Sequence, residues 1–170
     1  MIKLAKGGSV HGKFRRMISV YVDITAPLYW WKEFDTYKVG TVANSCSTMH
    51  EIHAKKFTVD DFSHEHLIYE ESRKAMFQTI ESLNHFREAF LAYKQDDETK
   101  KNYWWQMIQL LPSSYNQKRT VMLNYEVLAG MYQYRKEHKL DEWREFCEWI
   151  EELPYSEIIT CTDGRGVKTD

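Results

Sequence analysis

The sequence predicts an α+β fold in which one or two short N-terminal strands precede a mostly helical remainder. Residues 17–24 alternate between apolar and polar side chains, which is the pattern of a half-buried strand. From residue 66 onward, apolar residues recur mostly at steps of three and four, as in amphipathic helices. The 170 residues contain no repeat or linker composition that would divide them. We therefore expect a single domain over residues 1–170.

The predicted strand leads directly into the first predicted helix. Four β-branched residues form the apolar face of the strand: Ile18, Val20, Val22 and Ile24. Pro27 then opens a helix, because proline is tolerated at the first helical position. Leu28, Trp31 and Phe34 share one face of this helix. Gly40 marks its expected end.

A long polar connection over residues 41–65 follows this helix. It is expected to contain a short helix that Thr58 or Asp60 caps. Helical spacing of apolar residues then predicts a long helix over residues 66–93.

Three further helices are expected, over about residues 97–111, 113–136 and 141–153. Asp96 or Asp97 is the expected N-cap of the first, and Ser113 or Ser114 of the second. Residues from about 155 to 170 lose all periodicity and are expected to form a loose tail.

Composition excludes several classes of partner. The net charge of −2 gives no overall positive field that would attract nucleic acid. No apolar run approaches the length of a membrane span, and the N-terminus lacks the apolar core of a signal peptide. Three irregularly spaced cysteines are typical of free thiols in a reducing compartment. We expect a cytoplasmic protein with neither a nucleic-acid nor a membrane partner.

A dense series of small polar residues follows the first predicted helix. Its members are Thr41, Asn44, Ser45, Cys46, Ser47 and Thr48. Such residues supply hydrogen-bond donors without bulk, which suits a phosphate or a nucleotide. They are also simply common in loops. Cys46, with His50 four residues later, could only act as a nucleophile if a base lowered its pKa, and no residue pattern indicates one.

Three other groups of residues admit two interpretations each. Four histidines lie within seventeen residues: His50, His53, His64 and His66. Their spacing matches no standard zinc pattern, so we expect solvated loop histidines and no metal site. The consecutive aromatics Tyr29, Trp30 and Trp31 cannot all face one core, so some of them must meet another element, a partner subunit or a ligand ring.

Arg135 lies near the end of the helix predicted over 113–136, eleven residues after Asn124, so the two would share a face. An arginine at this position is favourable for the helix dipole alone. It could also serve as a fixed cationic fork for a phosphate or an anionic ring.

Taken together, these elements resemble the flavin-dependent thymidylate synthase (ThyX) family. The step Ala26-Pro27 falls where that family has an Ala-Pro step before its Arg-His-Arg-x-x-Ser-x-Asn-x-x-Ser-x-Arg signature. When the two sequences are aligned from this Ala-Pro step without a gap, the signature corresponds to residues 36–48. Leu111-Pro112, Asn124 and Arg135 follow at intervals similar to those of the family. The resemblance covers about residues 10–140.

The chain departs from the family pattern at several charged positions. Thr36, Tyr37 and Lys38 replace the Arg-His-Arg of the signature, and Thr48 replaces its last arginine. Glu126 stands where an arginine is expected shortly after Asn124. One lysine cannot reproduce two planar guanidinium groups.

The resemblance implies roles for particular residues. Arg135 would be the catalytic residue and would contact the pyrimidine of a dUMP-like substrate. Other substrate-binding positions would be Glu33, Cys46, Ser47 and Thr48. The FAD-binding positions would be Thr36, Tyr37, Lys38, Thr41, Asn44 and Asn124. The resemblance also implies methylenetetrahydrofolate and NADPH as co-substrates, and a homotetramer.

Three functions follow from this reasoning, and the sequence does not decide between them. The first is a divergent flavin- and folate-using enzyme that acts on a pyrimidine nucleotide. The second is a non-catalytic protein that keeps the fold to bind a nucleotide. The third is a protein-interaction module of phage origin with a vestigial cleft.

Overall fold

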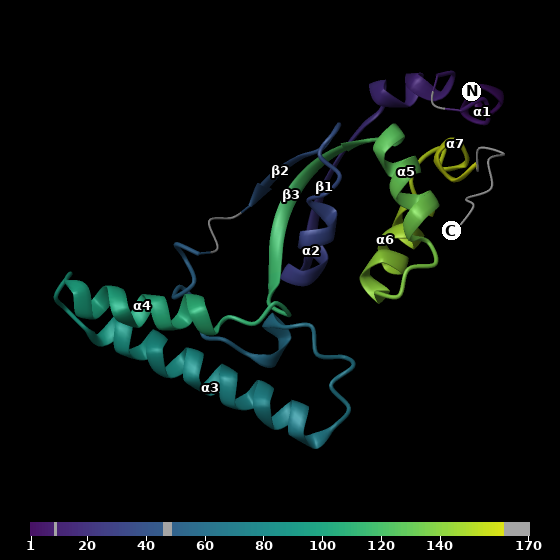
Figure 1. The fold of residues 1–170 in the computed structure, drawn as a ribbon. Helices are drawn as coiled ribbons and strands as arrows, with labels where there is room; N and C mark the ends of the chain where they lie inside the picture. Colours follow the sequence, from purple (N-terminus) through teal and green to yellow (C-terminus); the bar gives the residue numbers. More distant parts are fainter. Residues whose placement is uncertain (9, 46–48, 162–170) are drawn as a thin grey trace. The chain divides into compact units, whose positions relative to one another are not determined.

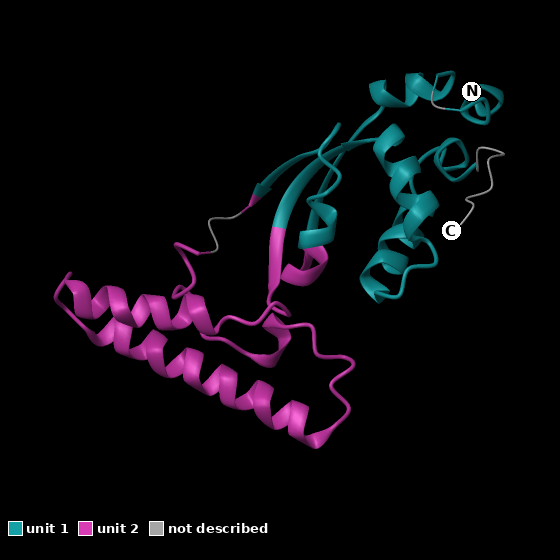
Figure 2. Cartoon of the chain, in the orientation of Figure 1, with its two compact units in different colours: residues 1–24, 32–44, 119–170 teal, residues 25–31, 45–118 magenta. Residues whose placement is uncertain are grey.

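A computed structural model of the chain describes residues 1–8, 10–45 and 49–161 (Figure 1). These residues form two compact units (Figure 2). Unit 1 consists of residues 1–24, 32–44 and 119–170, and unit 2 consists of residues 25–31 and 45–118. The single domain expected from the sequence stays a prediction.

Three strands form one sheet in the order β1-β3-β2: β1 (Ser19–Pro27), β2 (Val42–Ser45) and β3 (Asn116–Asn124). In β1, half-buried Val20, Val22 and Ile24 alternate with exposed residues, which confirms the predicted strand. The strand continues to Pro27, so the helix α2 (Leu28–Phe34) begins one residue after the proline.

Unit 1 surrounds the helix α5 (Tyr125–Arg135). This helix packs against α6 (Asp141–Glu151), α7 (Glu157–Thr160) and the 3-10 helix η1 (Gly12–Met17), while α1 (Ile2–Ala5) contacts α7 and η1. Residues at most 3% exposed lie on α5, α6 and α7, and they include Leu128, Met131, Trp143, Ile150, Ile158 and Ile159. These apolar side chains come from three different helices, so α5, α6 and α7 share one core.

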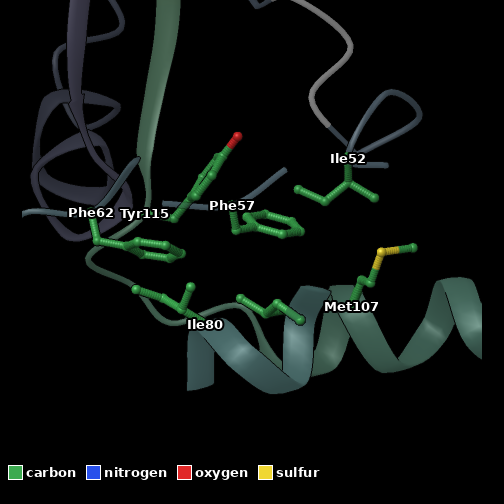
Figure 3. Packing of buried hydrophobic residues seen from close by; sticks show 7 residues of the cluster. Ile52, Phe57, Phe62, Ile80, Met107 and Tyr115 are labelled. Atoms are coloured by element: carbon green, nitrogen blue, oxygen red, sulfur yellow. The ribbon is translucent and has the colours of Figure 1, made fainter. Parts of the chain in front are cut away.

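Unit 2 is built on a helical hairpin of α3 (Glu70–Ala92) and α4 (Glu98–Leu110), which lie side by side (Figure 1). Asp97 caps α4 by accepting hydrogen bonds from the backbone N–H groups of Thr99 and Lys100, as predicted. Next to the hairpin lies an apolar cluster, shown in Figure 3. Its buried members are Ile52, Phe57, Phe62, Ile80, Leu83, Met107 and Tyr115.

The connection after residue 48 contains the short 3-10 helix η2 (Val59–Asp61). Thr58 is its N-cap, and Asp61 completes a capping box by accepting from the Thr58 backbone N–H at 2.8 Å. The prediction that Thr58 or Asp60 caps a helix here is thus confirmed for Thr58.

The aromatic triplet meets other elements of unit 2. Trp30 and Trp31 are each 1% exposed, and the Trp31 indole N–H donates to the Gln117 carbonyl at 2.9 Å. The Tyr29 hydroxyl lies 2.9 Å from the Ser63 hydroxyl. The triplet was expected to meet another element, a partner subunit or a ligand ring. Contacts with other elements of the same chain are enough to account for Tyr29 and Trp31.

The main correction concerns residues 113–124, which the sequence analysis assigned to a helix. Residues 116–124 form the strand β3 instead, and α5 is capped by Asn124, not by Ser113 or Ser114. Buried residues alternate along most of this segment: Gln117, Val121 and Leu123 are at most 8% exposed, and Arg119 between them is half-buried. Pairing with β1 and β2 satisfies the backbone of this segment and overrides its helical spacing.

Three boundaries also differ from the predictions. The helix α2 ends at Phe34, well before Gly40, and the long helix α3 begins at Glu70 and not at residue 66. The expected polar connection contains the strand β2. The expected loose tail does not begin at residue 155, because Ile158 and Ile159 of α7 are buried, and its part from residue 162 lies outside the described residues. Within the described residues, every helix is too short or too polar to span a lipid bilayer.

Candidate functional site

Arg135 links the end of α5 to the segment that follows α2, and all of these residues belong to unit 1. Its Nε donates to the Tyr37 hydroxyl at 2.9 Å, and its Nη1 donates to Glu33 Oε2 at 2.8 Å. Both bonds span about a hundred residues of sequence. The structure thus brings together three of the residues predicted for the site.

Glu33 is held from more than one side. Its Oε2 also accepts a hydrogen bond from the Trp143 indole Nε1 at 3.0 Å, and His138 Nε2 lies 3.5 Å from the same oxygen. The Leu140 backbone N–H donates to His138 Nδ1 at 3.2 Å, so neutral His138 carries its proton on Nε2, facing Glu33. A single carboxylate oxygen therefore accepts two hydrogen bonds, and His138 Nε2 lies near it as well.

Two aromatic rings flank the Arg135 guanidinium. Its Cζ lies 4.7 Å from the ring centroid of Trp143 and 5.6 Å from that of Tyr37, within the range of cation–π attraction. The Tyr37 and Trp143 rings meet edge to face at 5.9 Å. Arg135 is thus fixed by one carboxylate, one hydroxyl and two rings.

We call Glu33, Tyr37, Arg135, His138 and Trp143 the arginine cluster. The sequence analysis did not assign Trp143 or His138 to the site. Trp143 was expected only as a core residue of the last helix, and it is indeed fully buried. Its indole N–H, which must find a partner when the ring is buried, was the available signal for a polar contact.

The turn between α2 and β2 uses its own hydroxyl groups. Thr36 Oγ1 donates to the Glu33 carbonyl at 2.7 Å, and Thr41 Oγ1 donates to the Tyr37 carbonyl. These two threonines therefore stabilise the turn that presents Tyr37. This is the ordinary role of hydroxyl residues in loops, the alternative left open by the sequence.

Gly40 fits this turn against the start of α5. Its φ is +79°, and a Cβ built on it would lie 2.5 Å from Asn124 Nδ2. Asn124 is itself the N-cap of α5, because its Oδ1 accepts from the Val127 backbone N–H at 3.0 Å. Asn124 and Arg135 therefore stand at opposite ends of α5, and the face they were expected to share stays a prediction.

The other predicted site residues are exposed at the surface or lie outside the described residues. Lys38 is exposed in the turn and Asn44 is exposed in β2. Cys46, Ser47 and Thr48 fall outside the described residues, so their predicted roles stay predictions.

Glu126, which stands where the family pattern has an arginine, has a partner inside the protein. Arg15, only 4% exposed, donates from Nε to Glu126 Oε2 at 2.7 Å and from Nη1 to the Ile158 carbonyl at 3.1 Å. A buried guanidinium needs such a carboxylate, since an unpaired buried charge is costly. Glu126 therefore compensates the charge of Arg15 inside unit 1.

Metal and thiol chemistry find little support in the part of the chain that the structure describes. There, no three His, Cys, Asp or Glu side chains come close enough together to hold a metal ion. Burial, with Glu151 nearby, raises the pKa of the Cys147 thiol to about 11, so this thiol stays protonated at neutral pH.

No protein-family model and no curated protein matches the chain at the level of sequence. Solved structures do match it. One is the flavin-dependent thymidylate synthase ThyX from Helicobacter pylori complexed with FAD and dUMP, at 13% identity and a TM-score of 0.52, over 90% of this chain and 89% of that one. A second structure of ThyX from the same organism, also with FAD and dUMP, matches at 12% identity and a TM-score of 0.54, over 93% and 91% of the two chains.

Likeness at this level of identity concerns the fold, and it extends over nearly the whole length of both chains. It agrees with the mixed, mostly helical architecture described above. The chain has a ThyX-like α+β fold.

Proposed function

We propose that the arginine cluster is the binding site for the base of a pyrimidine nucleotide similar to dUMP. The observation that carries this proposal is the fixed geometry of Arg135. Two hydrogen bonds and two ring contacts orient its guanidinium, yet Nη2 donates no hydrogen bond to any described residue. A preoriented N–H donor beside aromatic rings suits the carbonyl oxygen of a flat ring.

Two further features support a base over a bare phosphate. Glu33 offsets the charge of Arg135, which weakens its attraction for a free anion but leaves its N–H groups as donors. The half-buried Tyr37 ring offers a surface next to the donor. The ThyX structures that share the fold hold dUMP together with FAD. Nucleotide binding is thus the function that both the cluster and the fold favour.

The residues expected to bind FAD fit that cofactor poorly. Four of the six predicted positions already use a side-chain polar atom in a hydrogen bond within unit 1: Thr36, Tyr37, Thr41 and Asn124. Among the six predicted positions, only Lys38 carries a positive charge, whereas the diphosphate of FAD carries two negative charges. We therefore place nucleotide binding before flavin chemistry.

Thermal unfolding in the presence of dUMP tests the proposal. Ligand at a hundred times its Kd stabilises the folded protein by about 2.7 kcal/mol, which corresponds to a Tm shift of roughly 5–10 °C for a chain of this size. The Arg135→Ala variant should lose this shift. Isothermal titration with the folded variant separates lost binding from lost stability.

Arg119 provides a matched control, because it pairs with a carboxylate in the same unit. Its Nη1 lies 2.8 Å from Asp35 Oδ1, outside the arginine cluster. Arg119→Ala should keep the full dUMP shift. A shift that survives in Arg135→Ala, or disappears equally in both variants, contradicts the proposed site.

A second candidate is FAD-dependent methylation of the nucleotide, with methylenetetrahydrofolate and NADPH as co-substrates. It is favoured by the fold shared with FAD-bound ThyX. Purified protein would then be yellow, or would become so after reconstitution with FAD. A colourless sample after reconstitution, combined with a dUMP shift, leaves nucleotide binding without flavin chemistry.

A further inference from the structure

Unit 2 contains a pocket of about 460 Å³. None of its lining residues belongs to the arginine cluster, which lies in unit 1. It is lined by Thr25, by residues 115–118, and by seven residues of the segment 51–61: Glu51, Ile52, Ala54, Lys55, Phe57, Asp60 and Asp61. Five of the lining residues are buried: Ile52, Phe57, Asp61, Tyr115 and Gln117. The remaining side chains form an exposed or half-exposed rim. The pocket therefore has a built, partly apolar floor that the proposed nucleotide site does not use.

Tyr115 is the most informative residue of this floor. It is 8% exposed, and its ring packs edge to face on Phe57 at 6.4 Å and on Phe62 at 5.7 Å. Its hydroxyl accepts or donates no hydrogen bond among the described residues, and Figure 3 shows it directed away from Ile80 and the apolar cluster. The hydroxyl oxygen is not among the buried unpartnered side-chain atoms of the described residues, so it is accessible from the pocket. The hydroxyl thus points to a ligand.

Lys55 provides a second donor at the pocket. Its ammonium group pairs with Asp61 Oδ1, and Asp61 Oδ2 accepts from the Thr58 backbone N–H in the capping box. Both oxygens of Asp61 are therefore occupied, whereas an ammonium group with one bond keeps two N–H donors. The hydrogen bond to Asp61 raises the pKa of Lys55, and burial raises the pKa of Tyr115. Both groups remain donors at neutral pH.

The charges around the pocket have both signs. Its lining contains the ammonium groups of Lys55 and Lys118 and the carboxylates of Glu51, Asp60 and Asp61. A dianion would meet exposed carboxylates at the rim, and a simple cation would meet the two lysines. A ligand that itself carries one charge of each sign avoids both conflicts.

We propose that this pocket binds a small zwitterion of the α-amino-acid type. The Tyr115 hydroxyl and the Lys55 ammonium group hold its carboxylate, and Glu51 and Asp60 attract its ammonium group. Its apolar side chain lies on Ile52 and Phe57. This site is separate from the proposed nucleotide site and does not depend on it.

Isothermal titration of the full chain with L-norleucine tests the proposal. Hexanoate lacks the amino group of norleucine and pentylamine lacks its carboxylate, so each probe removes one half of the recognition. Norleucine should bind saturably and at least about tenfold more tightly than either, since a hydrogen bond to a charged group accounts for about that factor. Inorganic phosphate should bind more weakly than norleucine.

Tyr115→Phe should weaken norleucine binding about tenfold and leave pentylamine binding unchanged, because it removes one donor to the carboxylate. Its Tm should stay at the wild-type value, since the hydroxyl has no hydrogen-bond partner in the part of the chain that the structure describes. Tyr134→Phe, at a tyrosine 63% exposed on unit 1, is the matched control and should bind like wild type. Lys55→Gln gives a second, independent test with the Asp61 hydrogen bond retained.

Three results would overturn the proposal. Norleucine that binds no more tightly than hexanoate and pentylamine excludes recognition of a zwitterion. Tighter binding of phosphate assigns the pocket to a dianion. Unchanged norleucine affinity in both Tyr115→Phe and Lys55→Gln excludes the two donors.

Discussion

Replacing Gly40 by alanine should destabilise unit 1 through two separable effects. The backbone at residue 40 has a φ of +79°, and an L-residue with a Cβ pays about 1 kcal/mol or more to adopt this left-handed conformation. The new Cβ would also lie 2.5 Å from Asn124 Nδ2, far inside van der Waals contact.

The clash cannot be relieved without loss, because Asn124 is held in place by its own capping bond. If its side chain rotates away, the Val127 backbone N–H loses its acceptor, and an N-cap contributes about 1 kcal/mol. The two effects together predict a loss of about 2–3 kcal/mol in the free energy of unfolding.

Urea denaturation followed by tryptophan fluorescence measures this loss. With a denaturant slope of about 2–3 kcal/mol/M, the midpoint should fall by roughly 1 M. Gly130→Ala is the matched control: Gly130 lies inside α5 and a Cβ there meets nothing within 4 Å. Alanine in the helix interior should raise stability by about 0.5–1 kcal/mol.

A double-mutant cycle with Asn124→Ala separates the two effects. Without the asparagine side chain, the cost of Gly40→Ala should fall to the backbone contribution of about 1 kcal/mol. The reasoning is refuted if Gly40→Ala unfolds at the wild-type midpoint, or if its cost is the same with and without Asn124.

Three further predictions follow from particular contacts. The hydrogen bond to Glu151 raises the pKa of Tyr132 to about 12, so the folded state keeps a proton that the unfolded state loses near pH 10. Wild-type stability should therefore fall between pH 10 and 12 more steeply than that of Tyr132→Phe, and parallel slopes would contradict this. Burial alone would raise the pKa of Asp61, but hydrogen bonds from Lys55 and Thr58 outweigh it and lower the pKa. This carboxylate contributes stability above its unfolded pKa of about 4 that is lost as the pH falls further, so Asp61→Asn should lower stability at pH 7 by about 1–2 kcal/mol and show a flatter acid limb. Sedimentation at micromolar concentration should give four times the mass of one chain, the tetramer that the resemblance implies, and a monomeric mass would contradict it.

Local signals in the sequence determined several features without help from distant residues. The alternation of Val20, Val22 and Ile24 is sufficient to identify β1, and Asp97 and Thr58 are identified as caps by their residue type and position. Capping and helical hydrogen bonds close within four residues, so a short window of sequence contains both partners. The last helix, predicted over 141–153 and observed over 141–151, is likewise a feature that a short window of sequence determines.

Tertiary structure decided the features whose partners lie far apart in the chain. The segment 116–124 contains alternating Val121 and Leu123, but it also fits helical spacing, and only pairing with β1 and β2 makes it a strand. The contacts of Glu33 with Arg135 and Trp143 join residues more than a hundred positions apart. Hydrogen bonds and packing of this kind depend on where the whole backbone brings two side chains, and no local pattern encodes that distance.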